Sequence, residues 1–349
     1  MDHKAEYIWL QNGRIALDAM LAAIKAATVS IRMEMYIFHT GATADEFRAA
    51  LIAACQRGVK TRVLADGLGS YSLPDSFWND FRVSGGEFRL FNPIKLSRMS
   101  IRDHRKILVC DEEVALIGGF NVASEYYGDG VKSGWRDLGM QVRGPLVRQL
   151  AEAFDEMFAC ADFKHKPFTR LRASERQRTF QAPDAELLLG APGRNNPIKR
   201  ALRHELRDVD DVRIMCAYFL PPWRMRRDLI RIARRGGRVQ LILPQKSDVP
   251  FSRMAALSFY RRFLIAGVEI YEYEPQILHA KLFLFNDIVY VGSANLDSRS
   301  LNINYELSLR LSDARVARDA RTIWERIKGR FAYWILARID PYIALRQFE

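Results

Sequence analysis

Two histidine–lysine pairs in this sequence have the residue types and the spacing of a reactive site that binds an anion. His104 and Lys106 stand two positions apart, and His279 and Lys281 repeat that spacing in the second half of the chain. An ammonium group neutralises an anion, and an imidazole, with an unperturbed pKa of ~6.5, can act near neutral pH as a nucleophile or as a proton donor. Two copies of the motif indicate one shared site, to which each half contributes one histidine.

Each pair is followed by a glycine-led segment that ends in asparagine, Gly118–Asn121 after the first pair and Gly292–Asn295 after the second. Glycine-rich turns present backbone N–H groups, and asparagine adds an amide donor, so these segments can bind a tetrahedral anion. Phosphate fits this combination best. The predicted phosphate-binding residues are Gly119, Asn121, Ser293 and Asn295.

The two pairs lie in stretches with a strand-like pattern. Apolar and β-favouring residues dominate Ile101–Val109 and Leu278–Phe285. Because residues two positions apart in a strand point to the same side, the histidine and lysine of each pair should face the site together.

Around these strands the sequence alternates helical and strand patterns, which predicts an α/β fold with a largely buried sheet. The predicted helices are Leu17–Ile24, a helix that carries Phe47, Leu51 and Ala54 and stops at Arg57-Gly58, Pro145–Ala159, Pro197–Arg207, and Met225–Arg234, which ends at Gly236. The other predicted strands are Val29–Ile37, Val59–Ala65, Glu87–Phe91, Leu138–Val142, Val212–Leu220 and Val239–Leu243.

The second half repeats the order of the first, and the repeat extends beyond the motifs. Tyr36-Ile37-Phe38 corresponds to Tyr218-Phe219-Leu220, and Arg57-Gly58 to Arg235-Gly236, as expected of a duplicated chain. Between the halves, a stretch rich in Lys and Arg with little periodic apolar content indicates an exposed linker. The predicted divisions are a first domain at 1–162, a basic linker at 163–184 and a second domain at 185–349.

With these motifs the chain resembles the phospholipase D superfamily, in which two H-x-K-x4-D motifs meet at a pseudo-twofold interface. The first copy matches in full as His104, Lys106 and Asp111, whereas the second has Asn286 in the Asp position, followed by Asp287. The resemblance implies two similar phospholipase D-like α/β/α domains with the active site at their interface. It also implies that this aspartate supports the turn rather than the chemistry.

The resemblance assigns roles to the four paired residues. His104 would attack phosphorus to form a phosphohistidine, and His279 would protonate the departing alcohol and later deprotonate the acceptor. Lys106 and Lys281 would neutralise the non-bridging oxygens, so neither a metal nor a cofactor is expected.

A carboxylate should orient each imidazole through its second nitrogen. Related sequences carry this acid at the position of Glu306, downstream of His279. Asp137 is the corresponding candidate for His104. The four remaining histidines, His3, His39, His165 and His204, are expected to be structural.

The surroundings of the first motif resemble short bacterial cardiolipin synthases that lack N-terminal membrane helices. The resemblance implies an enzyme, a phosphatidyltransferase that passes a phosphatidyl group from phosphatidylglycerol or phosphatidylethanolamine to a hydroxyl of a second phospholipid such as phosphatidylglycerol. The alternative is a phospholipase D-type hydrolase or a nuclease of the same superfamily. A binding protein with a dead site is disfavoured because both pairs are intact. The matching segments are Tyr36–Phe38, Arg57–Val59, Arg102–Lys106, Gly118–Asn121, Trp135–Asp137 and Gly144-Pro145.

Charge and composition limit the partners of this 349-residue chain. A net charge of +12 favours anionic partners, either an acidic lipid surface or, under the alternative function, nucleic acid. No apolar run approaches the roughly 20 residues of a membrane-spanning helix, and the opening residues are no signal peptide. We therefore expect a cytoplasmic protein, peripherally associated with the inner face of the cell membrane. The cysteines lack metal-ligand spacing and should be reduced: Cys55, Cys110, Cys160 and Cys216.

Two segments without a counterpart in the repeat mix apolar and basic residues, Pro250–Ala266 and Phe331–Phe348. Such segments can dock on a membrane surface. Helices that pack on the core would show the same composition, and the sequence leaves both interpretations open.

Overall fold

The computed structural model describes residues 5–93, 101–161 and 177–334, without the side chains of 330–334. A seven-stranded sheet organises the first half, in the order β1-β7-β6-β5-β2-β3-β4. Its strands β2, β3 and β4 are parallel, and β5, β6 and β7 form an antiparallel meander. The bounds are β1 Glu6–Leu10, β2 Ser30–Met35, β3 Lys60–Asp66, β4 Glu87–Phe91, β5 Ile107–Cys110, β6 Val114–Gly118 and β7 Gly139–Arg143.

A nine-stranded sheet organises the second half, in the order β18-β13-β12-β10-β14-β15-β17-β9-β8. Two further short strands, β11 Phe219–Leu220 and β16 Leu296–Asp297, pair with each other. The bounds of the large sheet are β8 Arg178–Ala182, β9 Ala185–Gly190, β10 Asp211–Met215, β12 Arg238–Pro244, β13 Glu269–Tyr273, β14 Leu282–Phe285, β15 Ile288–Gly292, β17 Glu306–Leu311 and β18 Ala332–Trp334.

The two sheets have the same internal order. The strands β1-β7-β6-β5-β2-β3-β4 correspond one by one to β9-β17-β15-β14-β10-β12-β13, with the same parallel and antiparallel pairings. The predicted duplication is thus a duplication of a whole α/β unit. The two motifs precede corresponding strands, since the first pair comes just before β5 and the second just before β14.

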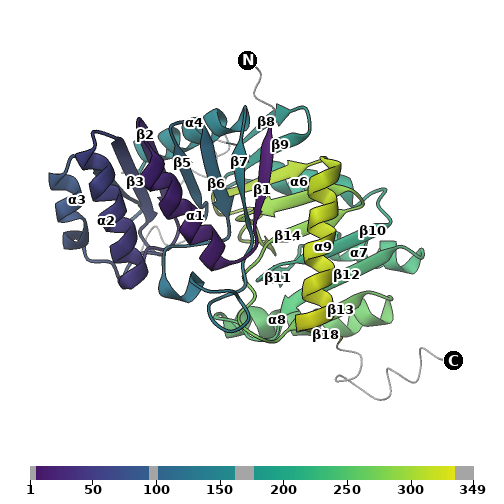
Figure 1. Cartoon of the computed structure of the whole chain (residues 1–349). Coiled ribbons are helices and arrows are strands. Elements are labelled where there is room, and N and C mark those ends of the chain that lie inside the picture. Colours follow the sequence, from purple (N-terminus) through teal and green to yellow (C-terminus); the bar gives the residue numbers. More distant parts are fainter. Residues whose placement is uncertain (1–4, 94–100, 162–176, 335–349) are drawn as a thin grey trace.

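Helices cover both faces of the first sheet, because alternate side chains of its strands point to opposite sides. Leu108 of β5 belongs to the core beneath α1 and α2, whereas its neighbours Ile107 and Val109 belong to the core beneath α4. Figure 1 shows α1 and α2 over one face of this sheet and α9 over the second sheet. The helices are α1 Gly13–Ala26, α2 Ala42–Gln56, α3 Asn79–Val83, α4 Leu146–Ala159, α6 Pro197–Glu205, α7 Trp223–Arg234, α8 Pro250–Ile265 and α9 Ala314–Phe331, with short 3-10 turns η1 Asp75–Trp78 and η3 Ser124–Tyr126.

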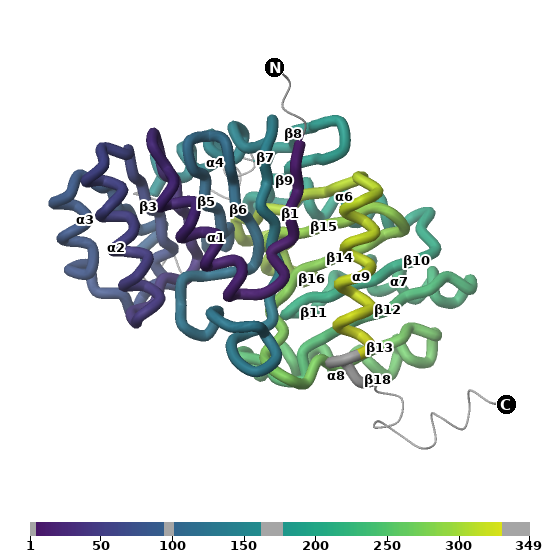
Figure 2. Tube along the Cα trace, viewed as in Figure 1, coloured from purple at the N-terminus to yellow at the C-terminus, as the bar shows by residue number. Residues whose placement is uncertain are grey.

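One hydrophobic core joins the halves. It combines buried side chains of α4 with those of α9 and with strands of both sheets, for example Leu150, Trp324, Ile117 and Val291. The chain trace in Figure 2 shows β1, the edge strand of the first sheet, beside α9 of the second half. The two α/β units are therefore held in one arrangement by a shared apolar core.

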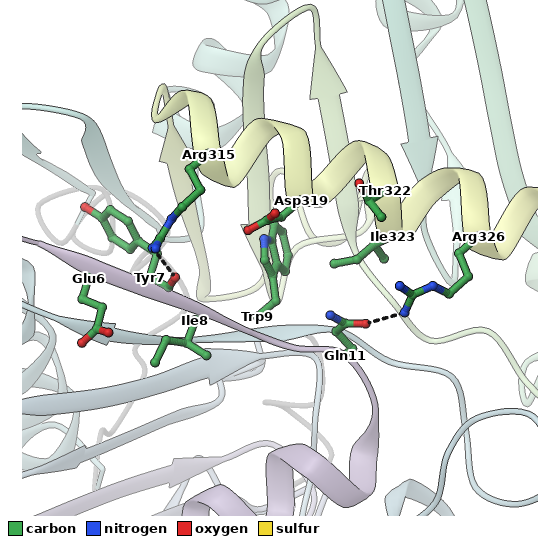
Figure 3. A pocket seen from close by; sticks show the side chains of 10 residues that line it. All are labelled: Glu6, Tyr7, Ile8, Trp9, Gln11, Arg315, Asp319, Thr322, Ile323 and Arg326. Carbon is green, nitrogen blue, oxygen red and sulfur yellow. Dashed lines mark hydrogen bonds between the residues drawn. The ribbon is translucent and has the colours of Figure 1, made fainter.

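Polar contacts fix the same junction from outside (Figure 3). Arg315 of α9 donates to the backbone oxygen of Tyr7 at 3.3 Å, and Arg326, three turns further along the helix, donates to Gln11 at 3.1 Å. Trp9 lies between them with its indole ring directed at the helix. A strand of the first unit is thus bound along the length of a helix from the second.

Helix α8 packs on the core with one face and leaves the other uncovered. Phe263 is 1% exposed, and Phe259 is partly buried beneath the guanidinium group of Arg226, which lies 4.2 Å from the ring centre. Phe251 and Met254, near the start of the helix, are 81% and 64% exposed. Packing on the core is therefore observed for one face of the segment, and docking of the exposed face on a membrane stays a prediction. The other candidate, Phe331–Phe348, lies beyond residue 334 outside the described residues, except for β18 and the end of α9.

The predicted linker lies largely outside the described residues, which resume at 177. Its last part forms β8, which pairs with β9 at the edge of the second sheet. The domain boundaries remain a prediction. Across the described part of the chain, no helix combines the length and the apolar character needed to cross a membrane. The cysteines are free thiols.

Candidate active site

The two histidine–lysine pairs lie in extended segments at the junction of the two units. Each pair comes just before a strand, His104 before β5 and His279 before β14. The strands predicted over 101–109 and 278–285 are therefore too long, because the sheets begin only after the lysine of each pair. The backbone hydrogen bonds of the motif segments go to the other half instead.

Each motif segment pairs with the segment that precedes the acid of the opposite half. The N–H of His104 donates to the oxygen of Tyr305 at 2.9 Å, and the N–H of Tyr305 donates to Arg102 at 2.9 Å. In the same way, the N–H of His279 donates to the oxygen of Arg136 at 2.7 Å. These bridges are parallel and isolated, and they tie the reactive residues of one half to the backbone of the other.

This exchange decides which acid orients which imidazole. His104 Nδ1 lies 3.1 Å from Glu306 Oε2, and His279 Nδ1 lies 2.6 Å from Asp137 Oδ2. Both predicted acids contact an imidazole, but the predicted pairing, Asp137 with His104 and Glu306 with His279, is wrong. The acids are exchanged because Tyr305 and Arg136, their chain neighbours, pair with the motif of the other half.

The two acids differ in their surroundings. Glu306 accepts from the Ser293 hydroxyl at 2.5 Å and from the Asn304 amide at 3.3 Å. Burial would raise the pKa of Glu306, but His104, Lys106 and the Ser293 hydroxyl outweigh burial, so the pKa is lowered. Glu306 is therefore an anion at neutral pH.

Asp137 has fewer donors, because Gly119 stands where the second half has Ser293. A Cβ on Gly119 would come within 2.3 Å of Asp137 Oδ1, so a side chain at this position cannot fit. Besides His279, the N–H of Leu138 donates to Asp137 at 2.8 Å. Burial raises the pKa of Asp137 to about 7, although Lys281 acts in the opposite direction. The carboxyl group is thus partly protonated near neutral pH.

Both imidazoles are uncharged at neutral pH. Burial lowers the pKa of His104 to about 4, with Glu306 offsetting part of this effect. Burial and the charge of Lys281 lower the pKa of His279 well below its ordinary value. Since each Nδ1 faces the carboxyl group of an acid, Nε2 is the nitrogen that can face substrate. In His279, Lys281 Nζ also lies 2.7 Å from Nδ1 and 3.1 Å from Nε2. Tyr126 places its hydroxyl 3.4 Å from His279 Nε2.

The two lysines lie beneath the histidines, each 1% exposed. Lys106 Nζ donates to the backbone oxygen of His104 at 2.6 Å, and Lys281 Nζ donates to the backbone oxygen of His279. Burial lowers both pKa values, that of Lys106 to about 7. An anion entering the site would stabilise the charged form of both lysines, because an opposite charge raises the pKa of an amine.

Asn121 and Asn295 occupy equivalent positions in the two halves. Asn121 Oδ1 accepts from the N–H of Ile37 at 2.9 Å, and Asn295 Oδ1 accepts from the N–H of Tyr218 at 3.4 Å. Each carbonyl is held by a backbone donor, so the amide NH₂ group is left for the cavity that both residues line. Of the other two residues predicted to bind phosphate, Ser293 instead donates to Glu306, and Gly119 lies against the carboxyl group of Asp137 without donating to it.

Asp111 supports a turn, as the resemblance implies. Its carboxylate accepts from the N–H groups of Thr28, Val29 and Ser30 and from the Thr28 hydroxyl, at 2.8–3.2 Å. Asn286 fills the equivalent position, where its Oδ1 accepts from the N–H of the residue at the start of β10 at 3.0 Å. Asparagine therefore preserves the contact to the neighbouring strand and loses the others.

Both histidines open into one cavity of about 490 Å³, and both asparagines line it. Its walls come from both halves, and the sequence analysis had missed most of them. The repeated Tyr36 and Tyr218 were a signal: their rings stand edge-on to His104 and His279, with ring centres 4.8 Å and 6.5 Å apart. The other wall residues include His39, Leu68, Tyr71, Tyr126, Asp248, Val249, Ser252, Asp297, Arg299 and Asn304.

His39 was expected to be structural, and it lies at the cavity with Nδ1 3.4 Å from Glu125 Oε1. The single histidine carried no repeat that would have indicated this position. His3 and His165 lie outside the described residues, and His204 is exposed in α6.

Comparisons with known proteins show the family of this chain. Residues 20–158 and 202–328 match the family model described as "Cardiolipin synthase, PLD-like domain". Cardiolipin synthase B of Shigella flexneri is 31% identical over 97% of this chain and 87% of its own length. The major cardiolipin synthase ClsA of Bacillus subtilis is 31% identical over 88% of this chain and 66% of its own length.

Solved structures support the fold. The chain superposes on phosphatidylserine synthase of Haemophilus influenzae with a TM-score of 0.75 and 13% identity, covering 98% of this chain and 92% of that one. Polyphosphate kinase of Porphyromonas gingivalis gives a TM-score of 0.62 at 15% identity, covering 97% of this chain and 49% of that one. The predicted fold class, two similar α/β domains, is confirmed.

Proposed function

Because this chain belongs to the cardiolipin synthase family of phospholipase D-like proteins, we propose that it transfers a phosphatidyl group to the hydroxyl of a second phospholipid such as phosphatidylglycerol. The observation that carries the proposal is the crossed pair of buried His–acid contacts opening into one cavity. Such a site has one imidazole for nucleophilic attack and one for proton transfer.

In the first step, His104 Nε2 attacks phosphorus of the donor lipid. A P–N bond forms and the bond from phosphorus to the headgroup oxygen breaks, its electron pair remaining on that oxygen. His279 supplies a proton to the oxygen, so the headgroup leaves as a neutral alcohol. This step requires a neutral His104, in accordance with its pKa of about 4, and His279 must take up a proton as the anionic substrate binds.

In the second step, a hydroxyl of the acceptor lipid occupies the place of the departed headgroup. His279, now neutral, removes its proton, and the oxygen attacks the phosphohistidine. The new P–O bond forms while the P–N bond breaks, which restores neutral His104. Both steps use the same two imidazoles in opposite directions.

Lys106, Lys281, Asn121 and Asn295 would stabilise the charge that develops on the non-bridging oxygens. Preorganised donors of this kind contribute roughly 3–4 kcal/mol each in measured cases. The lysines lie under the histidines and the asparagines line the cavity, so the donors come from both halves. Glu306, ionised by its surroundings, balances the charge of His104 and Lys106.

The lipid substrates imply that the cavity meets a membrane surface, so peripheral association with an anionic membrane belongs to the proposal. The net charge of +12 favours such a surface. Val249 at the cavity wall is 41% exposed and Phe251, two residues further on, is 81% exposed. These apolar side chains lie where lipid would enter.

Product analysis tests the function. The full chain is incubated with phosphatidylglycerol vesicles, and in parallel with single- and double-stranded DNA, and products are identified by mass spectrometry. We expect cardiolipin and glycerol from the wild type and from His204→Ala, and no turnover by His104→Ala or His279→Ala. Nucleotide release without lipid turnover would overturn the proposal in favour of a nuclease, and phosphatidic acid alone would indicate a hydrolase.

A further inference from the structure

The cavity is asymmetric at one position where the two halves should match. Asp248 follows the end of β12 by four residues, and Ser70 follows the end of the corresponding strand β3, Asp66, by four residues. Ser70 is buried and bonded to backbone, accepting from the N–H of Phe38 at 2.9 Å. Asp248 is instead an exposed carboxylate on the cavity wall.

Asp248 is held at the His279 end of the cavity. The hydroxyl of Tyr218 donates to Asp248 Oδ2 at 2.7 Å, and the ring of Tyr218 stands at 88° to the imidazole of His279. The charge of Asp248 reaches both catalytic groups of the second half, where it counteracts the lowering of the pKa values of His279 and Lys281 by burial. No corresponding carboxylate faces His104 from the first-half loop at 67–71.

A carboxylate in a phosphate site repels the phosphate and must therefore serve another part of the substrate. A carboxylate accepts hydrogen bonds from hydroxyl or ammonium groups. In the proposed reaction, the alcohol oxygen that leaves or attacks lies at His279. A donor group on the next carbon of that alcohol would lie towards Asp248.

Resting on the proposed function, we propose that Asp248 and Tyr218 form a headgroup subsite that binds the hydroxyl next to the reacting one in a glycerol headgroup. In the first step this is the middle hydroxyl of the departing glycerol, beside the oxygen that takes a proton from His279. In the second step it is the middle hydroxyl of the acceptor phosphatidylglycerol, beside the oxygen that gives its proton to His279. The subsite thus binds the hydroxyl next to the reacting oxygen in both steps. Water has no second hydroxyl and is therefore a poorer acceptor of the phosphatidyl group.

Soluble alcohols test the subsite without a lipid acceptor. The full chain is given phosphatidylglycerol vesicles with equal concentrations of 1,2-propanediol and 1-propanol, and the two phosphatidyl products are compared in one reaction. Because a hydrogen bond to a charged acceptor commonly contributes a factor of ten or more, we expect the wild type to favour the diol about tenfold. Asp248→Ala should bring the ratio close to one and increase phosphatidic acid relative to cardiolipin.

Further variants keep the test independent of folding. Tyr218→Phe removes only the donor that holds the carboxylate, and we expect an intermediate ratio. Asp210→Asn should keep the wild-type ratio, because Asp210 lies just before β10 with its side chain 79% exposed and paired with Arg235. A second competition replaces 1-propanol by ethanolamine, whose ammonium group can also donate to a carboxylate. A preference for ethanolamine over the diol would overturn the assignment of the subsite to a hydroxyl.

The transferase function and the headgroup subsite can fail separately. If the wild type forms no phosphatidyl product with any alcohol or lipid, the proposed transferase function fails. If it forms cardiolipin but Asp248→Ala retains the preference for the diol, the transferase function survives and the headgroup subsite is refuted.

Discussion

His104 is hydrogen bonded through Nδ1 to Glu306, a residue 202 positions further along the chain and in the opposite α/β unit. His279 has the reciprocal contact to Asp137 of the first unit. Neither unit therefore contains a complete His–acid pair, although each contains a complete His–Lys motif. Catalysis therefore requires the two units to be joined, because each unit supplies the carboxyl group that orients the imidazole of the other.

The crossed pairs predict that Glu306→Gln and Asp137→Asn fail at different steps. Glu306→Gln removes the charge that stabilises His104 during attack, so we expect formation of the phosphoenzyme to slow about 100-fold or more. Asp137→Asn affects His279, whose proton is needed only for a poor leaving group. With a p-nitrophenyl phosphodiester, whose phenolate leaves unprotonated, Asp137→Asn should retain the burst of p-nitrophenol that Glu306→Gln loses.

Rapid-mixing absorbance measures the burst, and both variants are compared with the wild type at equal concentration. The opposite result, a burst lost in Asp137→Asn and kept in Glu306→Gln, would mean that His279 is the nucleophile. Loss of the burst in both variants, with unchanged circular dichroism, would contradict the separation of the two steps.

The pKa values predict how the hydrolysis of the soluble p-nitrophenyl phosphodiester depends on pH. Attack requires neutral His104, whose pKa burial lowers to about 4, so kcat/KM should rise as pH increases through that value. Charge stabilisation requires protonated Lys106, whose pKa burial lowers to about 7, so kcat/KM should fall as pH rises beyond it. Glu306 raises both pKa values, and Glu306→Gln should therefore move both limbs to lower pH. A plateau that continues above pH 9 would show that Lys106 keeps its proton.

The equivalent turn residues Asp111 and Asn286 predict a difference in stability rather than in catalysis. Asp111 accepts four hydrogen bonds and Asn286 accepts one from the adjoining strand. We expect Asp111→Ala to lower the free energy of unfolding by about 2–3 kcal/mol and Asn286→Ala by about 1 kcal/mol. The activity of the folded fraction should change less than about twofold, because neither residue lines the cavity.

The loss of stability in these alanine variants has two causes, backbone strain and the loss of a hydrogen-bond acceptor. Strain contributes because Asp111 and Asn286 have φ values of 55° and 50°. Glycine adopts such values freely, so Asn286→Gly isolates the hydrogen bond, and Asn286→Asp should be nearly neutral. Thermal unfolding gives the stabilities. A 100-fold loss of activity in Asn286→Gly with an unchanged melting temperature would assign this position to the chemistry instead.

Much of the fold could be predicted because its elements obey local rules. Helix α2 ends before Arg57-Gly58 as predicted, where Gly58 adopts a φ of 85° that favours glycine. The strand Glu87–Phe91 is found as predicted. The predicted strand Val212–Leu220 is interrupted, because the N–H of Tyr218 bonds to the side chain of Asn295 rather than to a neighbouring strand.

The site could be predicted only as far as its residues repeat. His104 and His279 stand out through their lysines, but which acid faces which imidazole depends on how the two units meet. Spacing along the chain suggested contacts within one half, whereas the backbone of Tyr305 joins His104. The position that matches Asp248 in the first half is occupied by the buried Ser70, so the repeat gave no indication of a carboxylate at the cavity.

Lipid has to reach the cavity through the surface around its opening. Helix α8 begins beside the cavity, and its first turns expose Phe251 and Met254, which are 81% and 64% exposed. Phe263 on the opposite side of the same helix is buried, so it cannot insert into a bilayer. The exposed pair offers apolar area next to the opening, and arginines on α7 and α8 supply the attraction to anionic lipid, worth about 1 kcal/mol each near the surface.

We therefore expect the double variant Phe251→Ser, Met254→Ser to bind phosphatidylglycerol vesicles at least about tenfold more weakly and to lose lipid turnover by the same factor. Each substitution removes a large apolar side chain that would be buried in the membrane. Hydrolysis of a soluble phosphodiester should be unchanged, because neither residue lines the cavity.

Ile265→Ser is the matched control. Ile265 is 59% exposed on the same helix but lies about 21 Å beyond Phe251, at a rise of 1.5 Å per residue. Vesicle co-sedimentation measures binding. Equal losses for the double variant and Ile265→Ser would show that the start of α8 has no special contact with the membrane. Equal losses on lipid and soluble substrate, with a lowered melting temperature, would show that the exposed pair stabilises the fold instead.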